Sequence, residues 1–199
     1  MSIQDSGNRR QFSSGAVRDI QEGKGRCDLL PLFQVAEYSS TAMPNIRYEL
    51  SHISSFMSSG DVSHLYKAIE VFIAEVYPNS QTAILELSKH YEEGAMKYGE
   101  HNWEKGIPLH CYIDSGVRHL LKYSRGDEDE PHDRAFLWNM FGAIWTCEHY
   151  SIGSDMLDIP VMQAGKITIS NAQAAWEDWV YSIPAKTASI SSGEHEHTS

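Results

Sequence analysis

Apolar residues recur at helical spacing along most of this chain, and the pattern is strongest in its middle. The segment at 131–149 carries apolar side chains around most of its circumference, which predicts a buried central helix. Segments at 80–99 and 110–124 have one apolar face, which predicts amphipathic helices packed beside it. Weaker signals predict packing helices near 45–57 and after Asp61. The pattern predicts an all-α fold, a helical bundle in which short connections make sequential helices neighbours.

The character of the chain changes on both sides of this helical region. Residues 1–14 are polar and are expected to be disordered, so the predicted helical domain is 15–150. Residues 151–183 are expected to form a small C-terminal appendage with a short strand and a helix. This appendage is a docking element or an oligomer contact, and we expect a homo-oligomer. The tail at 184–199 is poor in hydrophobic residues and is expected to be disordered.

Charge and cysteine usage limit the classes of partner. The chain of 199 residues has a formal net charge of −11, whereas a nucleic-acid or anionic membrane surface requires a basic face. An anionic ligand would therefore need local cations or a metal. The three cysteines lack CxxC spacing, which indicates a reducing compartment. With no apolar run of 18 residues, the sequence predicts a soluble, cytoplasmic protein without nucleic-acid or membrane partners.

Acidic residues and histidines between the predicted helices are candidates for a metal site. Asp129 is the expected N-cap of the central helix, where the acidic run ends and a divalent cation would relieve repulsion. His132 projects from this helix along a narrow strip of small or polar residues. The candidate metal ligands are Glu92, Asp129, Glu130 and His132, and the candidate catalytic residues are Glu92, His119 and His132. Hard oxygen ligands favour Mg²⁺ or Mn²⁺, and histidine shifts the preference toward Mn²⁺.

The helical pattern at 80–99 indicates which of the adjacent residues Glu92 and Glu93 belongs to this site. Its apolar face contains Ile84 and Leu87, and its opposite face, with His90 and Glu93, is expected to be solvated. Glu92 lies at the border, where a half-buried carboxylate would require a cation or a metal. We therefore predict that Glu92 shares one pocket with the residues at 129–132.

Several basic and polar residues are candidates for contacts with a bound ligand. Lys24 and Arg26 lie between and beside glycines in GKGRCDLLP, which can place cations on phosphate oxygens or simply form a flexible basic turn. Trp103 beside Asn102 can stack on a base, or it can fold over the core instead. The candidate substrate-binding residues are Lys24, Arg26, Lys97, Asn102, Trp103, Arg118 and Asn139.

Two of these candidate residues also have structural alternatives. Arg118 can form a surface ion pair with Asp114, four residues earlier on the predicted helix. His119 can be a histidine at the edge of the core, bonded to a carbonyl.

Four motifs together resemble the bacteriophage and bacterial dATP/dGTP diphosphohydrolase family. They are GAVRDIQEGKGRCDLLP at 15–31, HYEEGAMKYGEHNWEKG at 90–106, DSGVRHLLKY at 114–123 and RGDEDEPHDRAFLWN at 125–139. The resemblance implies hydrolysis of a purine deoxynucleoside triphosphate to monophosphate and pyrophosphate during phage nucleotide-pool remodelling. The implied ligand is a purine nucleotide and the implied cofactor is Mg²⁺ or Mn²⁺.

Two other classes of nucleotide hydrolase match the motifs of this chain only in part. Helical pyrophosphohydrolases of the MazG type carry an EExxE helix and then an ExxD helix, whereas Glu92-Glu93 is followed here by GAM. Only the interval from Glu130 to Asp133 has ExxD spacing. The adjacent pair His132-Asp133 after His119 resembles HD phosphohydrolases, which would imply another metal centre and release of triphosphate.

A third hypothesis is a binding protein that does not hydrolyse its ligand. A phage protein with a cationic and aromatic pocket can bind and sequester a nucleotide or a cyclic-nucleotide immune signal. The carboxylates and histidines beside the cations favour an enzyme. Nucleotide hydrolysis with and without EDTA separates the two.

Overall fold

The computed structural model describes residues 6–164, which form an all-α bundle with one small hairpin. Its helices are α1 (Leu32–Ala42), α2 (Arg47–Ser59), α3 (Ser63–Val76), α4 (Ser80–Tyr98), α5 (Leu109–Arg125), α6 (His132–His149) and α7 (Pro160–Gln163). Short 3-10 turns occur at η1 (Cys27–Leu29), η2 (Pro44–Ile46) and η3 (Asn102–Lys105). Within 6–164, no helix has both the length and the apolarity needed to cross a membrane.

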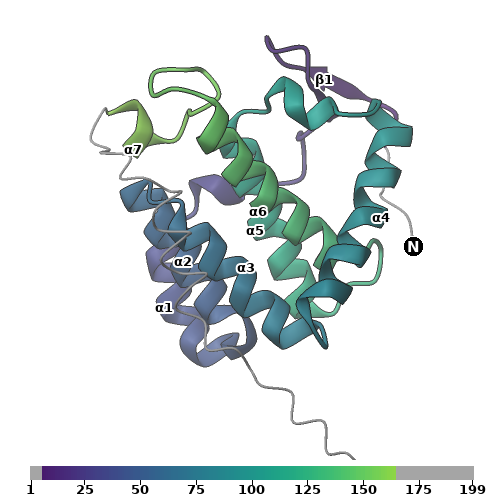
Figure 1. Ribbon diagram of the computed structural model, residues 1–199. Helices are drawn as coiled ribbons and strands as arrows, with labels where there is room; N and C mark the ends of the chain where they lie inside the picture. The colour runs from purple at the N-terminus through teal and green to yellow at the C-terminus, as the bar shows by residue number, and fades with distance from the viewer. Residues whose placement is uncertain (1–5, 165–199) are drawn as a thin grey trace, which may run out of the picture.

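The three main helices expected from the sequence are confirmed as α4, α5 and α6. Twelve of the 18 residues of α6 are buried, because this helix packs against α5, α4 and α3. Figure 1 shows α5 and α6 running through the middle, with α1 to α3 on one side and α4 on the other. The prediction of a central helix at 131–149 is confirmed.

Small residues allow α5 and α6 to approach closely. A Cβ atom added at Gly142 would lie 2.3 Å from Cε1 of Tyr112, and one at Gly116 would lie 2.4 Å from Cε of Met140. The strip of small or polar residues on α6 that carries His132 includes Gly142. Around Gly142 this strip is filled by the buried ring of Tyr112, which packs against the helix backbone.

A hairpin at the N-terminal end lies across the helices. Strands β1 (Arg9–Gln11) and β2 (Val17–Asp19) pair antiparallel, so the prediction of disorder at 1–14 is wrong for residues 9–11. The side chain of Asn102 holds β2 by two bonds to the backbone of Val17, of 2.9 and 2.8 Å. The Asp114 carboxylate accepts bonds of 2.6 Å from the Gln21 side chain and the Cys27 amide. These bonds fix the hairpin over one end of the bundle (Figure 1).

The chain after α6 returns to the bundle. Asp158 caps α5 by accepting a 2.9 Å bond from the His110 amide, and its other oxygen pairs with the His110 ring. Met156, Leu157 and Met162 are buried, so the first part of the expected appendage belongs to the core. The strand and helix expected in the rest of the appendage, and the tail at 184–199, lie outside the described residues.

Glu49 on α2 makes the stability of this bundle depend on pH. It is fully buried, and neither carboxylate oxygen has a hydrogen-bond partner within residues 6–164. Burial, with a smaller contribution from the charge of Glu75, raises the pKa of Glu49 from 4.5 to about 7. Because the folded pKa is raised, the stabilisation by the proton is complete below about pH 4.5 and is lost as pH rises through about 7.

Between pH 5 and pH 8 the wild type should lose stability as Glu49 ionises. We expect Glu49→Gln to lose less over the same range, by on the order of 1 to 3 kcal/mol. Glutamine stays neutral at both pH values, so no buried carboxylate ionises. Urea unfolding of variant and wild type at the two pH values measures the difference. The exposed Glu70→Gln on α3 is the control, and equal pH dependence in all three proteins would contradict the assignment.

Candidate functional site

A cavity of about 330 Å³ lies between the N-terminal hairpin and helices α4, α5 and α6. Although the whole chain has a net charge of −11, five basic side chains line this cavity. They are Arg10, Arg18, Lys24, Arg118 and Lys122, and we call the cavity the cationic pocket. The carboxylates on its lining are those of Asp19, Asp114 and Glu130. The local excess of positive charge favours an anionic ligand.

Arg18 on β2 is the most unusual cation in this pocket. Its guanidinium lies 5.4 Å from the ring centre of Tyr112 and 5.3 Å from that of Trp138. One nitrogen donates a 3.0 Å bond to Oδ1 of Asn139, while Nη1 is buried and has no partner within residues 6–164. Burial lowers the pKa of Arg18. A buried guanidinium with an unused donor is suited to a carboxylate or phosphate oxygen.

Arg10 on β1 adds a second unused donor. Its Nη1 donates a 2.9 Å bond to the Gln21 side chain, whereas its Nε is buried without a partner in the described chain. Neither arginine is among the predicted substrate-binding residues, although Arg18 lies in the motif at 15–31. No hydrophobic periodicity marks a strand of three residues, so the tertiary position of the hairpin is needed to place both arginines in the pocket.

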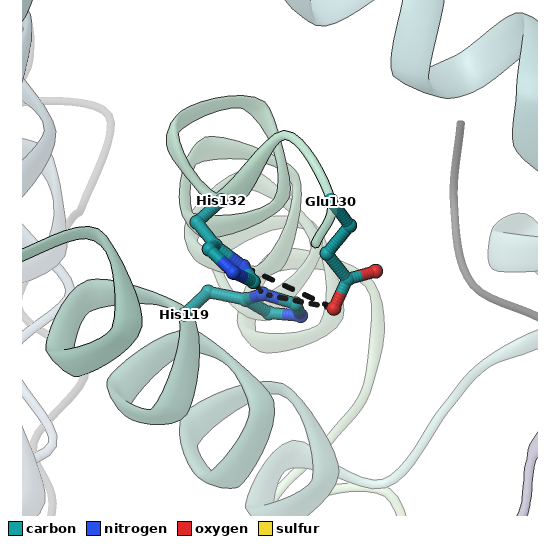
Figure 2. A group of neighbouring side chains, drawn as sticks. All are labelled: His119, Glu130 and His132. Carbon is teal, nitrogen blue, oxygen red and sulfur yellow. Dashed lines mark hydrogen bonds and ion pairs between the residues drawn. The ribbon is translucent and has the colours of Figure 1, made fainter. Parts of the chain in front are cut away.

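His119, Glu130 and His132 converge at the edge of the cationic pocket. Figure 2 shows the His119 side chain from α5 facing His132 at the start of α6, with Glu130 from the preceding loop beside them. The two Nδ1 atoms are 2.9 Å apart. Oε1 of Glu130 lies 3.7 Å from Nδ1 of His119 and 3.9 Å from Nδ1 of His132. His119 thus bonds to another histidine, not to a carbonyl.

This cluster fits a divalent metal. Donor atoms held at roughly 2.0–2.2 Å around one ion are separated by about 3 to 4 Å from each other, and the three observed separations are in or close to this range. Burial and the neighbouring imidazoles of His132 and His90 lower the pKa of His119 well below its usual value, which keeps it in the neutral, ligating form. Two imidazole nitrogens and one carboxylate favour Mn²⁺ or another transition metal over Mg²⁺.

Asp129 acts on this cluster from behind. Its Oδ1 lies 2.7 Å from Nε2 of His132, on the side of the ring opposite the Nδ1 atom that faces His119. This contact orients the imidazole, as an outer carboxylate does at many metal sites. Lys122 donates a 2.8 Å bond to the other oxygen and, as the largest cause, lowers the pKa of Asp129 to about 2. The structure therefore places Asp129 as an orienting group and not among the converging donors.

A second group of possible ligands fits a metal less well. Asp127, Asp129 and Nε2 of His132 also lie within reach of one ion. However, Asp127 already pairs with Arg125 and Asp129 with Lys122, so local cations balance both carboxylates. We therefore centre the candidate metal site on His119, Glu130 and His132.

His90 on α4 lies on the wall of the cationic pocket, contrary to the expected solvated face. It is 7% exposed, and its Nδ1 is buried without a partner within 6–164. Burial, with the charges of Arg134 and Arg18, lowers the pKa of His90 to about 3. The buried face of α4 consists of Ala83, Leu87 and His90, and Ile84 is 47% exposed. The spacing of Ala83, Leu87 and His90 is helical, but an apolar scale assigns the histidine to the surface.

The structure does not bring Glu92 to the metal cluster. Glu92 is exposed and lines a neighbouring cavity of about 350 Å³, so the predicted shared pocket of Glu92 and His132 does not form in the described part of the chain. Its neighbour Glu93 is half-buried, with Oε1 3.5 Å from the Arg134 guanidinium. The face of α4 is rotated relative to the predicted one, because His90 takes a buried position.

The candidate substrate cations separate into two groups. Lys24 and Arg118 line the cationic pocket, where Nζ of Lys24 lies 2.8 Å from Asp19 and Arg118 pairs with the buried Asp114. One alternative expected the ion pair of Arg118 and Asp114 to lie at the surface, and this is wrong because Asp114 is buried. Arg26 pairs with Asp28 outside the pocket.

Of the other predicted contact residues, Asn102 and Asn139 line the cationic pocket, whereas Lys97 and Trp103 do not. Lys97 lies over the Tyr98 ring at 5.3 Å and does not line the cationic pocket. Asn102 lines this pocket, but its side chain bonds twice to the backbone of Val17. Trp103 packs edge-on against Tyr91. Asn139 also lines the cationic pocket, where it positions Arg18.

The His132-Asp133 pair does not act as a unit. Asp133 accepts a 2.6 Å bond from the Tyr77 hydroxyl, on the side of α6 away from the strip that carries His132. Only the histidine of this pair reaches the cluster. The resemblance to an HD metal centre therefore does not extend to the geometry.

Comparison with known proteins gives one result. Residues 72–155 match the family described as dATP/dGTP diphosphohydrolase, N-terminal. No curated protein and no solved structure matches the chain. The matched segment begins within α3 and ends after α6, so it contains His90, His119, Glu130 and His132 but not the hairpin arginines. Residues 72–155 therefore match the N-terminal region of the dATP/dGTP diphosphohydrolase family, which confirms the resemblance for the three motifs at 90–106, 114–123 and 125–139. The motif at 15–31 lies outside the matched segment.

Proposed function

We propose that the cationic pocket binds the phosphates of a purine deoxynucleoside triphosphate and that the chain hydrolyses this nucleotide to monophosphate and pyrophosphate. The proposal depends most on Arg18, which lines a pocket bordered by the His119, Glu130 and His132 cluster and whose buried Nη1 has no partner within residues 6–164. The family match supports a nucleotide as the anion. The resemblance to bacteriophage members supports a place in phage nucleotide-pool remodelling.

His119, Glu130 and His132 would hold a divalent metal, with Mn²⁺ as the preferred ion. When bound, this ion would neutralise phosphate charge and supply an activated water. Asp129 keeps the His132 ring oriented through Nε2, and Lys122 keeps Asp129 ionised. The carboxylate of Glu130 is the anionic member of the set, so its charge matters most for affinity toward a cation.

The arginines bind and orient the substrate. Arg18 and Arg10 present their unused donors to phosphate oxygens from the hairpin, and Arg118 approaches from α5. Asn139 and the rings of Tyr112 and Trp138 hold the Arg18 guanidinium in place before substrate arrives. A preorganised cation loses little conformational freedom when it binds, which favours tight binding of phosphate.

Product analysis tests this function. The purified full chain is incubated with each of the common NTPs and dNTPs, with Mn²⁺, Mg²⁺ or EDTA, and the products are separated by anion-exchange chromatography. The proposal predicts monophosphate and pyrophosphate from dGTP or dATP with Mn²⁺, and no product with EDTA. Tight binding without product under every condition would favour a sequestering protein, and release of triphosphate would favour the HD-type reaction.

A further inference from the structure

A second cavity adjoins the cationic pocket and has the opposite character. This aromatic pocket, of about 350 Å³, has walls formed by Tyr91, Tyr98, Trp103 and Trp138. Its exposed lining is mainly apolar, and its charged neighbours include Glu92 and Glu100. No basic side chain of Arg or Lys lines it within residues 6–164. The two cavities together thus offer cations on one side and aromatic rings on the other, as a nucleotide requires.

The two cavities share part of their walls. Gly94, Tyr98, Asn102 and Trp138 line both. A Cβ atom added at Gly94 would meet nothing within 4 Å, although this glycine lies in the interior of α4. A helical glycine costs about 1 kcal/mol relative to alanine, and no close packing requires one here. The missing side chain therefore leaves open space where the two cavities meet.

We infer that the aromatic pocket is the base subsite of this enzyme, with the nucleotide crossing Gly94 between phosphates in the cationic pocket and base in the aromatic pocket. The inference rests on the proposed function. Trp138 links the two parts, because Arg18 lies against its ring on the side of the phosphates. Stacking on aromatic side chains contributes about 1 to 3 kcal/mol per base.

The charge at this pocket selects among the bases. Glu92 places a carboxylate, with two acceptor oxygens, on the lining of the aromatic pocket. Guanine presents two neighbouring donors, the N1–H and the 2-amino group, which match a carboxylate in a paired arrangement. Adenine has an unprotonated N1 and only its 6-amino donor on that edge. We therefore assign guanine as the preferred base and Glu92 as the residue that reads it, not as a metal ligand.

Calorimetry with two probes separates the subsites. The probes are the non-hydrolysable α,β-methylene analogue of dGTP and inorganic tripolyphosphate, each titrated into the full chain with Mn²⁺. Gly94→Leu should weaken binding of the dGTP analogue at least about tenfold and leave tripolyphosphate binding within about twofold, because leucine fills the crossing point. Thermal stability should not fall, since the added atoms enter open space in a helix.

Ser88→Leu, at an exposed position of α4 outside both cavities, is the matched control and should change neither affinity. Unchanged binding of the dGTP analogue by Gly94→Leu would overturn the base subsite, and so would an equal loss of both probes. A wild type that binds neither probe would instead contradict the proposed function. For the base itself, Glu92→Gln should reduce the preference for the dGTP analogue over the dATP analogue about fivefold or more, and a wild type that prefers adenine would overturn the assignment of guanine.

Discussion

Glu130→Gln is expected to lower the Mn²⁺-dependent hydrolysis rate by about 1000-fold or more, while nucleotide affinity changes by less than about tenfold. The substitution keeps the size of the side chain and removes the only anionic group among the three converging donors. Phosphate binding depends mainly on the arginines of the cationic pocket. The substitution should therefore remove less stabilisation from the bound ground state than from the transition state. The rate with saturating dGTP and the affinity for its methylene analogue measure the two effects.

Glu128→Gln is the control for this substitution, because it makes the same charge change on the same loop. Glu128 is exposed and does not line the cationic pocket. Its rate should stay within about twofold of wild type, as for most exposed substitutions. If Glu130→Gln keeps wild-type turnover and Mn²⁺ affinity, the metal cannot be held by His119, Glu130 and His132 as proposed.

Arg18→Met is expected to weaken binding of both tripolyphosphate and the nucleotide analogue by about 100-fold, which corresponds to loss of a buried charge-assisted contact. The same substitution should leave the folded protein as stable as wild type or make it more stable. Methionine has similar length, and the change removes a buried guanidinium whose Nη1 has no partner within 6–164. Isothermal titration and urea unfolding of one protein preparation measure both effects.

Opposite changes in binding and stability distinguish a ligand contact from a structural residue. Arg26→Met is the control, because Arg26 pairs with Asp28 outside the pocket and should affect neither probe. If Arg18→Met unfolds the chain, or if Arg26→Met weakens phosphate binding equally, the assignment of Arg18 as the phosphate contact is wrong.

The sequence pattern predicts the helices well because their signal is local. Helix α6 buries most of its circumference, and the apolar pattern at 131–149 records this directly. His119 and His132 could also be predicted, because a short loop brings the end of α5 next to the start of α6. The acidic run before α6 then places Glu130 beside both histidines.

The contacts made by the hairpin could not be predicted from local patterns. Arg18 reaches Asn139, which is 121 residues away in the chain, and its strand is held by Asn102, 85 residues from Val17. Neither interaction leaves a periodic trace in the sequence. The buried face of α4 was mispredicted for a different reason. It includes the polar His90, while Leu85 is 67% exposed. Binding sites place polar groups inside, which is where hydrophobic patterns mislead.

Hydrolysis of dGTP in ¹⁸O-labelled water, with Mn²⁺ and product analysis by mass spectrometry, tests whether the chain releases pyrophosphate from the nucleotide. It records at once which bond breaks and whether water is the attacking group. We expect dGMP and pyrophosphate in equal amounts, with one labelled oxygen per turnover, found in dGMP if water attacks the α-phosphorus and in pyrophosphate if it attacks the β-phosphorus, and no reaction for Glu130→Gln. Release of deoxyguanosine with triphosphate, or tight binding of dGTP without any product, would contradict it.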